Sequence, residues 1–161
     1  MGAELFIEEI RQTQEKKYWP PFNEAVRKRD QFPETSEKWA IEQKKVEKYH
    51  ELLYSRGYFR DPYFVDGIFP WLGLSWDEVV SMVDENARLK TKNLKKLREM
   101  VANAKVSLPR RPKWMDMHQW LNLKANNKSP EWRAYIEKRR KGLLKFLDTA
   151  IHLKSPVLCS L

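Results

Sequence analysis

Apolar side chains recur along residues 75–105 with the spacing of one helix face. They follow one another at steps of three, four or seven residues: Val79, Val83, Ala87, Leu94, Leu97, Val101 and Ala104. Ser75 and Glu78 have the spacing of a capping box, in which each side chain satisfies a free backbone N–H of a starting helix. The pattern predicts one amphipathic helix of roughly 30 residues, about 45 Å long, interrupted only where Lys90 takes an apolar-side position. Its other side is cationic and carries Arg88, Lys92, Lys95, Lys96 and Arg98.

Other segments also show helical patterns. Helices are expected at residues 3–18, 23–29, 36–56 and 116–126, and from Pro130 onward. Pro20 and Pro21 are expected to end the first of them, because neither residue has a backbone N–H. The tail, residues 155–161, is expected to be irregular.

These elements predict an all-α protein. We expect an extended, non-globular arrangement of about five or six helices around the long helix at 75–105, joined by aromatic-rich and Pro-rich connections. The chain would be a single extended unit over residues 1–161. Its segments would be N-terminal helices at 1–56, an aromatic loop at 57–74, the long helix at 75–107, and a basic linker with C-terminal helices at 108–161.

Aromatic side chains crowd the predicted loop, among glycines and prolines that disfavour regular structure. Such rings either fold over the protein's own long helix or anchor in pockets of a larger assembly, because they carry large apolar areas. The same alternatives hold for the corner at residues 19–22. The candidate interface residues are Trp19, Tyr58, Phe59, Tyr63, Phe64, Phe69, Trp71, Trp76, Trp114 and Trp120.

The charge of the chain changes sign halfway along it. Residues 1–80 hold 12 Lys and Arg against 15 Asp and Glu, a net charge of −3, whereas residues 81–161 hold 19 against 7, a net charge of +12. A one-sided positive field attracts phosphate groups, anionic lipid head groups and acidic protein surfaces. The alternative is that Lys-rich helix sides are simply solvated.

Two segments concentrate this charge: the proline-containing linker at 108–114 and the run at 138–141. Arg beside Trp in the linker can stack on bases or hold phosphates, and it can equally hold an acidic protein surface. Four consecutive cations go around a helix, so at least one of 138–141 is expected to lie near the apolar side and to need an acidic or phosphate partner. The candidate residues for an anionic partner are Arg110, Arg111, Lys113, Lys138, Arg139, Arg140 and Lys141.

Motifs for catalysis or cofactor binding are absent from the sequence. It has no glycine-rich phosphate loop, no HExxH, no nucleophile elbow and no CxxC. Cys159 is the only cysteine, and the three histidines are isolated from one another and from other ligand types. We therefore expect no enzyme activity, no catalytic residue, no cofactor and no metal site.

Targeting and membrane signals are also missing. The longest uncharged apolar stretch, residues 67–76, contains Pro70 and has about half the length of a membrane span. The acidic residues near the start are unsuited to a cleavable presequence. The sequence predicts a protein that is not an integral membrane protein.

Two short sets of motifs resemble subunits of mitochondrial complexes. Leu72-Gly73-Leu74 with Asp77 and Glu78, a basic helix, Leu108-Pro109 with Trp114 and a closing basic helix resemble the small matrix-side helical subunit of ubiquinol–cytochrome c reductase. Phe22-Asn23-Glu24, Phe32-Pro33-Glu34 and Trp39 are similar to the N-terminal part of ATP synthase subunit d. Both resemblances imply a non-catalytic helical subunit on the matrix side of the inner membrane.

Two hypotheses about function follow. In the first, the protein is a structural accessory subunit of a large inner-membrane complex of the respiratory chain or ATP synthase, bound to larger subunits and to anionic lipid head groups. In the second, it is an RNA-binding component of a mitochondrial ribosome or another ribonucleoprotein. Steep loss of affinity with rising salt would favour the second hypothesis.

Overall fold

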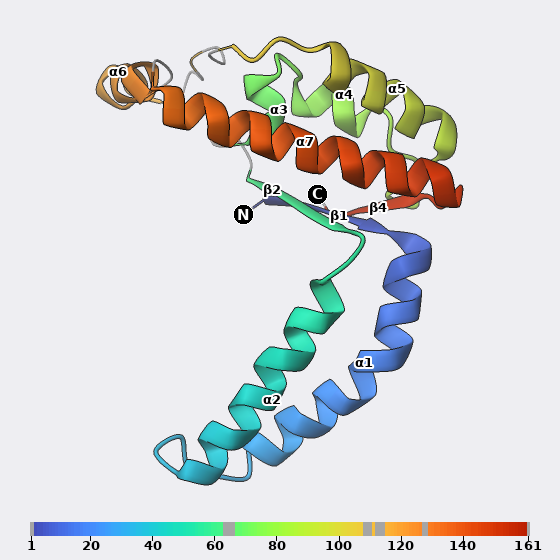
Figure 1. Ribbon diagram of the computed structural model, residues 1–161, viewed down its shortest axis with the longest axis vertical. Coiled ribbons are helices and arrows are strands. Elements are labelled where there is room, and N and C mark those ends of the chain that lie inside the picture. The colour runs from blue at the N-terminus through green and yellow to red at the C-terminus, as the bar shows by residue number, and fades with distance from the viewer. Residues whose placement is uncertain (1, 63–66, 108–110, 112–114, 127–128, 161) are drawn as a thin grey trace. The chain divides into compact units, whose positions relative to one another are not determined.

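The computed structural model describes residues 2–62, 67–107, 111, 115–126 and 129–160. These residues form seven helices and a four-stranded antiparallel sheet, and the fold is 66% helical. The all-α prediction was therefore wrong, because four strands were missed. In chain order the elements are β1 Gly2–Ile7, α1 Glu8–Arg29, α2 Glu37–Tyr54, β2 Tyr58–Pro62, α3 Ile68–Trp71, α4 Trp76–Val80, β3 Arg88–Leu89, α5 Thr91–Asn103, α6 Met117–Asn126, α7 Pro130–Leu153 and β4 Val157–Ser160 (Figure 1).

The chain divides into two compact units. Phe6–Tyr58 make up one, which we call the hairpin unit, and Met1–Leu5 with Phe59–Leu161 make up the other, which we call the C-terminal unit. The C-terminal unit holds 20 Lys and Arg against 12 Asp and Glu, a net charge of +8, whereas the hairpin unit holds 11 against 10. The positive charge thus belongs to the C-terminal unit.

Helices α1 and α2 form an antiparallel pair in the hairpin unit (Figure 1). Pro20 and Pro21 lie inside α1 and do not end it, contrary to the prediction of two separate helices. Two prolines remove only two intrahelical hydrogen bonds, and packing along α2 stabilises the helix on both sides of them. The buried Gln14 side chain also ties the pair together, because its Nε2 donates to the Leu52 carbonyl at 3.0 Å and to Ser55 Oγ at 3.1 Å.

The sheet has the strand order β2-β1-β4-β3. Strand β1 replaces the start of the helix predicted at residues 3–18, because Leu5, Phe6 and Ile7 are all buried, as in an inner strand. Strand β4 replaces the tail that was predicted to be irregular. Its Val157 pairs with Leu89 of β3 in antiparallel register.

The predicted long helix at 75–105 is in fact α4, β3 and α5. The capping box at its start is confirmed, since Glu78 N–H donates to Ser75 Oγ and Ser75 N–H donates to the Glu78 carboxylate. The helix ends within two turns because Asp84 Oδ1 accepts from the backbone N–H groups of Asn86 and Arg88 and forms a turn. Lys90 then ends the extended stretch as the N-cap of α5 and pairs with Asp84 at 3.1 Å.

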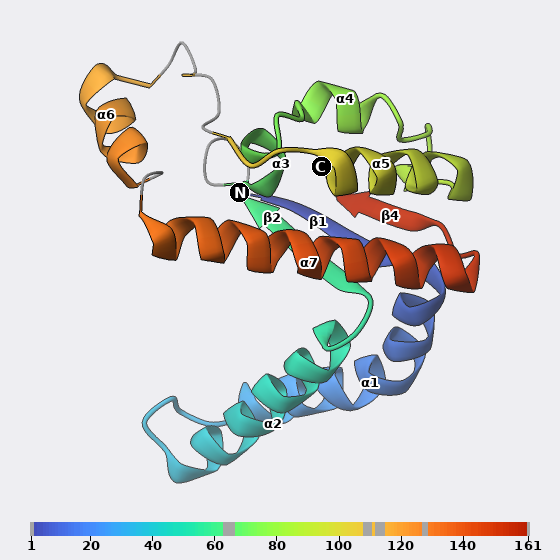
Figure 2. The ribbon, with the colours of Figure 1, turned by 45° about the horizontal axis from the view of Figure 1, so that its top comes forward.

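Helices α5 and α7 lie side by side and enclose the core of the C-terminal unit with the sheet (Figures 1 and 2). The fully buried residues at their contact are Leu94, Leu97, Val101, Ile136, Leu143 and Leu147. The Phe59 ring of β2 meets the Phe146 ring of α7 at a centroid distance of 6.1 Å. Within the described residues, no helix combines the length and the apolar character needed to cross a membrane.

The predicted aromatic loop at 57–74 contains β2 and α3 rather than irregular chain alone. Phe69 and Trp71 of α3 are completely buried, so they are core residues and cannot anchor a partner. Trp71 packs edge-on against Trp132 of α7, with ring centroids 5.5 Å apart. Of the two alternatives for these rings, folding over the protein's own helices is the one observed for α3.

Candidate anion-binding face of helix α7

The four consecutive cations of α7 divide into an inward pair and an outward pair. Arg139 and Arg140 are partly buried, whereas Lys138 and Lys141 are exposed. This confirms the prediction that at least one cation of the run requires an acidic partner, because Arg139 Nη2 lies 3.1 Å from Oδ1 of Asp61. The same guanidinium donates to the Arg60 carbonyl and lies 5.1 Å from the centre of the Phe59 ring.

Asp61 is a completely buried carboxylate at the end of β2. Both of its oxygens accept from the backbone N–H of Ile68, at 2.8 and 2.9 Å, so the carboxylate also holds the start of α3. Burial raises the pKa of Asp61 above its ordinary value, while the Ile68 and Arg139 hydrogen bonds oppose that shift. Asp61 therefore joins β2, α3 and α7 and is already occupied by structural partners.

Arg140 has an equally structural role at the end of α5. Its Nε donates to the Val101 carbonyl at 3.0 Å, and its Nη2 donates to the Ala102 carbonyl. These carbonyls belong to the last turn of α5, where intrahelical donors run out. Arg140 thus caps α5 and is not available to a partner.

The outward side of α7 carries three cations that the fold does not use. Lys138, Lys141 and Lys145 are exposed, and none of them forms an ion pair with any described residue. Their spacing of three and four residues places them on one side of the helix. We call these three residues the cationic face.

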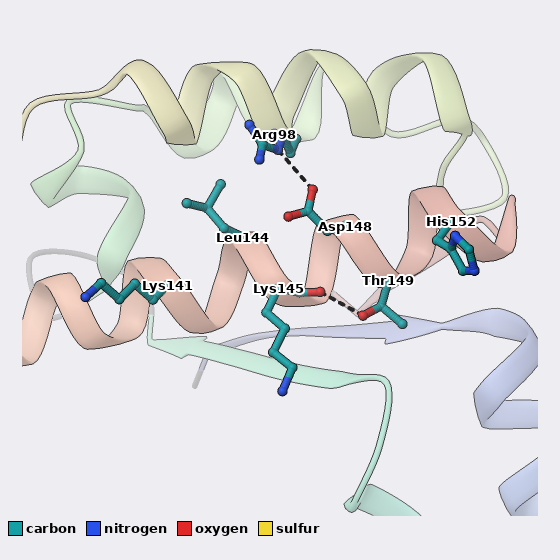
Figure 3. A pocket seen from close by; sticks show the side chains of 7 residues that line it. All are labelled: Arg98, Lys141, Leu144, Lys145, Asp148, Thr149 and His152. Atoms are coloured by element: carbon teal, nitrogen blue, oxygen red, sulfur yellow. Dashed lines mark hydrogen bonds and ion pairs between the residues drawn. The ribbon is translucent and has the colours of Figure 1, made fainter.

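A shallow groove between α5 and α7 borders the cationic face (Figure 3). It encloses about 550 Å³ and is lined by Arg98, Lys141, Leu144, Lys145, Asp148, Thr149 and His152. Arg98 crosses it from α5 and pairs with Asp148 at 3.0 Å, whereas the side chains of Lys141 and Lys145 extend without a partner (Figure 3). The groove is open and predominantly positive, so it suits an extended anionic ligand better than a small enclosed substrate.

The remaining candidate interface residues are scattered. Trp19 is 47% exposed on α1 and stacks on Phe22 at 5.5 Å, and Trp120 is half-buried in α6. Tyr58 is half-buried and packs 5.0 Å from the Phe6 ring. The residues or side chains outside the described part of the structure are Tyr63, Phe64, Trp76, Arg110, Lys113 and Trp114.

Arg111 lies beyond the cationic face, and its Nη1 donates to the Met115 carbonyl at 2.8 Å. Sequence reasoning missed Lys145, although its spacing from Lys138 and Lys141 was a readable signal. It also missed the exposed Met117 and Leu121, which lie one turn apart on α6.

Metal-ligand side chains do not gather in the described part of the chain, where no group of three or more His, Cys, Asp or Glu could hold an ion. No family model, curated protein sequence or solved structure matches the chain.

Proposed function

We propose that this protein is a non-catalytic accessory subunit that attaches to an anionic surface of a larger assembly through the cationic face of α7. The observation that carries the proposal is the contrast within one run of four cations. Arg139 and Arg140 are bound to the protein's own acceptors, whereas Lys138 and Lys141, with Lys145, point away from the core and have no described ion-pair partner.

The rigidity of α7 supports this role. The helix is 24 residues long and is held by the Asp61 contact and by the buried Leu143 and Leu147, so the three ammonium groups sit on a fixed frame. Charges held on a rigid frame contribute to the rate and specificity of association, because little order has to be created on binding. Three exposed lysines contribute little to folding, so a partner is the simplest reason for grouping them.

The place of this assembly is a further part of the proposal. The resemblance to matrix-side mitochondrial subunits favours an inner-membrane complex of the respiratory chain or ATP synthase, with the protein peripheral to the membrane. That part is supported by sequence resemblance alone, and the cationic face would serve equally in another assembly.

Site-specific photo-crosslinking tests the proposal. A photoreactive amino acid at Ala134, which is exposed one turn before Lys138, should crosslink to the native partner in cells. The matched position is Ala40, which is exposed on α2 and should give no comparable product. Equal crosslinking at both positions, or none at Ala134, would contradict the proposed attachment.

A charge test needs two variants with equal changes in net charge. The face variant carries Lys138→Gln, Lys141→Gln and Lys145→Gln. The hairpin variant carries Lys16→Gln, Lys44→Gln and Lys48→Gln, at exposed positions of the hairpin unit. Both variants lose three positive charges. A difference in their binding to the partner therefore shows that the position of the lysines matters, and not the net charge.

A further inference from the structure

A glycine in the middle of α7 has no structural role in the fold. Gly142 is exposed and helical, and a Cβ built on it would meet no atom of the described residues within 4 Å. Glycine in a helix interior is less favourable than alanine because it gives up more backbone freedom on folding. The fold would therefore gain stability from a side chain at this position, and close approach of a partner to the backbone is a physical use of glycine that fits an exposed helix position.

Gly142 lies among the cations of the proposed site. Lys138 precedes it by one turn, Lys145 follows it by three residues and Lys141 is its neighbour. One turn of helix advances about 5.4 Å, so the lysines can flank, on one side, an anionic group that rests on the backbone at Gly142. A Cβ there would occupy the space between that group and the helix.

An aromatic hollow lies at the N-terminal end of the same helix. It encloses about 360 Å³ and is lined by Ser129, Glu131, Trp132 and Tyr135. Tyr135 is 44% exposed and lies three residues before Lys138, and its ring meets that of Trp132 at 5.3 Å. Within the described residues, the buried Nε1 of Trp132 has no hydrogen-bond acceptor. The hollow thus offers ring surface next to the cationic face.

We infer that α7 binds single-stranded nucleic acid, with the phosphodiester chain passing over Gly142 beside the three lysines and a base stacking at Tyr135. A row of cations beside aromatic rings is the combination that binds unpaired strands, because the cations follow the backbone and any base can stack on a ring. An acidic protein segment would use the lysines but would have no planar group for the aromatic hollow. This inference rests on the proposed role of the cationic face and names its partner.

Direct binding of defined oligonucleotides tests the inference. Fluorescence anisotropy with a labelled 12-nucleotide oligouridylate, repeated with oligodeoxythymidylate, should show binding by the full chain that weakens steeply with salt. Comparing the affinities for the two probes shows whether the protein prefers an RNA strand or a DNA strand. Gly142→Ala should weaken this binding at least fivefold while raising the melting temperature by about 2–4 °C. A substitution that raises the melting temperature and weakens binding is expected only when the partner itself requires the glycine.

The matched control is Ala40→Gly, the reverse exchange at an exposed helical position of α2 away from α7, which should lower stability and leave binding unchanged. Tyr135→Ala should weaken binding, whereas Tyr135→Phe should retain it, because stacking needs only the ring. Absence of binding at low salt would overturn the inference, and so would equal binding by native protein and Gly142→Ala. Equally tight, Gly142-sensitive binding of a polyglutamate peptide would overturn it in favour of an acidic protein.

Failure of this inference can be told from failure of the proposed function. If the face variant is lost from the native assembly but no oligonucleotide binds, the nucleic-acid partner is wrong and the attachment through α7 stands. If the face variant stays in the assembly as firmly as native protein, the attachment itself is wrong.

Discussion

Arg139 donates a hydrogen bond to the completely buried carboxylate of Asp61 across 3.1 Å, and this contact joins residues separated by 78 positions. The carboxylate also receives the backbone N–H of Ile68. One ion pair therefore connects β2, the start of α3 and the middle of α7. This pair, together with the buried Leu143 and Leu147, holds α7 in the orientation that turns its other cations outward.

Replacing Arg139 should destabilise the protein. Arg139→Gln leaves Asp61 buried without its cationic partner and should cost about 2 kcal/mol in the free energy of unfolding at neutral pH. Urea unfolding measures this value. The control is Arg98→Gln, which breaks the exposed pair with Asp148 and should change stability by less than about 1 kcal/mol. Equal losses of unfolding free energy in the two variants would mean that the Asp61 contact stabilises the protein no more than the exposed pair does.

The cost of Arg139→Gln should also depend on pH. The pKa of Asp61 is raised by burial, so its contribution to stability is present below the ordinary value of 3.8 and is lost as pH rises through the folded-state pKa. Arg139 opposes this rise, so its removal raises the pKa of Asp61 further and makes the loss larger. Unfolding free energies measured from pH 3 to pH 7 should show the cost of Arg139→Gln growing with pH. A cost that is constant or shrinks over this range would contradict the ion pair.

Arg140 and its neighbour Lys141 should have opposite roles. Arg140→Gln removes the donors to the Val101 and Ala102 carbonyls and should cost about 1–2 kcal/mol of stability. Lys141→Gln should leave the unfolding free energy unchanged within about 0.5 kcal/mol and weaken attachment to the partner. Thermal melts and co-purification of the two variants check this pair. A stability loss for Lys141→Gln equal to that for Arg140→Gln would place both side chains in the fold.

The thiol of Cys159 should react slowly with reagents until the sheet unfolds. It is 5% exposed in β4, and burial raises its pKa from 9.0 to about 12. At pH 8 the reactive thiolate is therefore scarce as well as covered. A thiol reagent such as DTNB should react slowly with native protein and rapidly in denaturant, with a rate that follows unfolding. Rapid reaction of the native protein would show that β4 is not held against the sheet.

Local signals in the sequence were sufficient for the starts of α2, α4, α6 and α7. The sequence left Thr35 or Ser36 as the cap of α2, and Ser36 takes that role through the Trp39 N–H. Ser129 caps α7 and Asp116 caps the turn at Gln119, as their spacing predicts. The apolar positions Ile136, Leu143 and Leu147 of α7 are buried as the periodicity predicts. These features depend only on residues within a few positions of one another, so a linear pattern contains them.

The strands depended on partners far along the chain. Val157 and Cys159 are buried only because β4 lies between β1 and β3, and no local pattern indicates those neighbours. Residues 84–88 were misread for a different reason, since a turn closed by Asp84 overrides the apolar spacing around it. Ala87 adopts a φ of 57° in this turn, which a continuous helix would not allow.

The candidate site was predicted in part. The charge of residues 138–141 was recognised, but the sequence could not say which of the four cations would bind acceptors within the protein itself. That division follows from Asp61 and from the end of α5, both distant in sequence.

The most direct test of the central claim is the retention of the two charge variants in the native assembly. We would tag the native protein, the face variant and the hairpin variant and purify each from the cells in which the protein naturally occurs. The purification is repeated over a range of salt concentrations, and the partner bound to each protein is quantified. We expect the hairpin variant to match native protein and the face variant to lose its partner at much lower salt, with an affinity reduced about 10- to 100-fold. Retention of the face variant at the same salt concentrations as native protein would contradict attachment through α7.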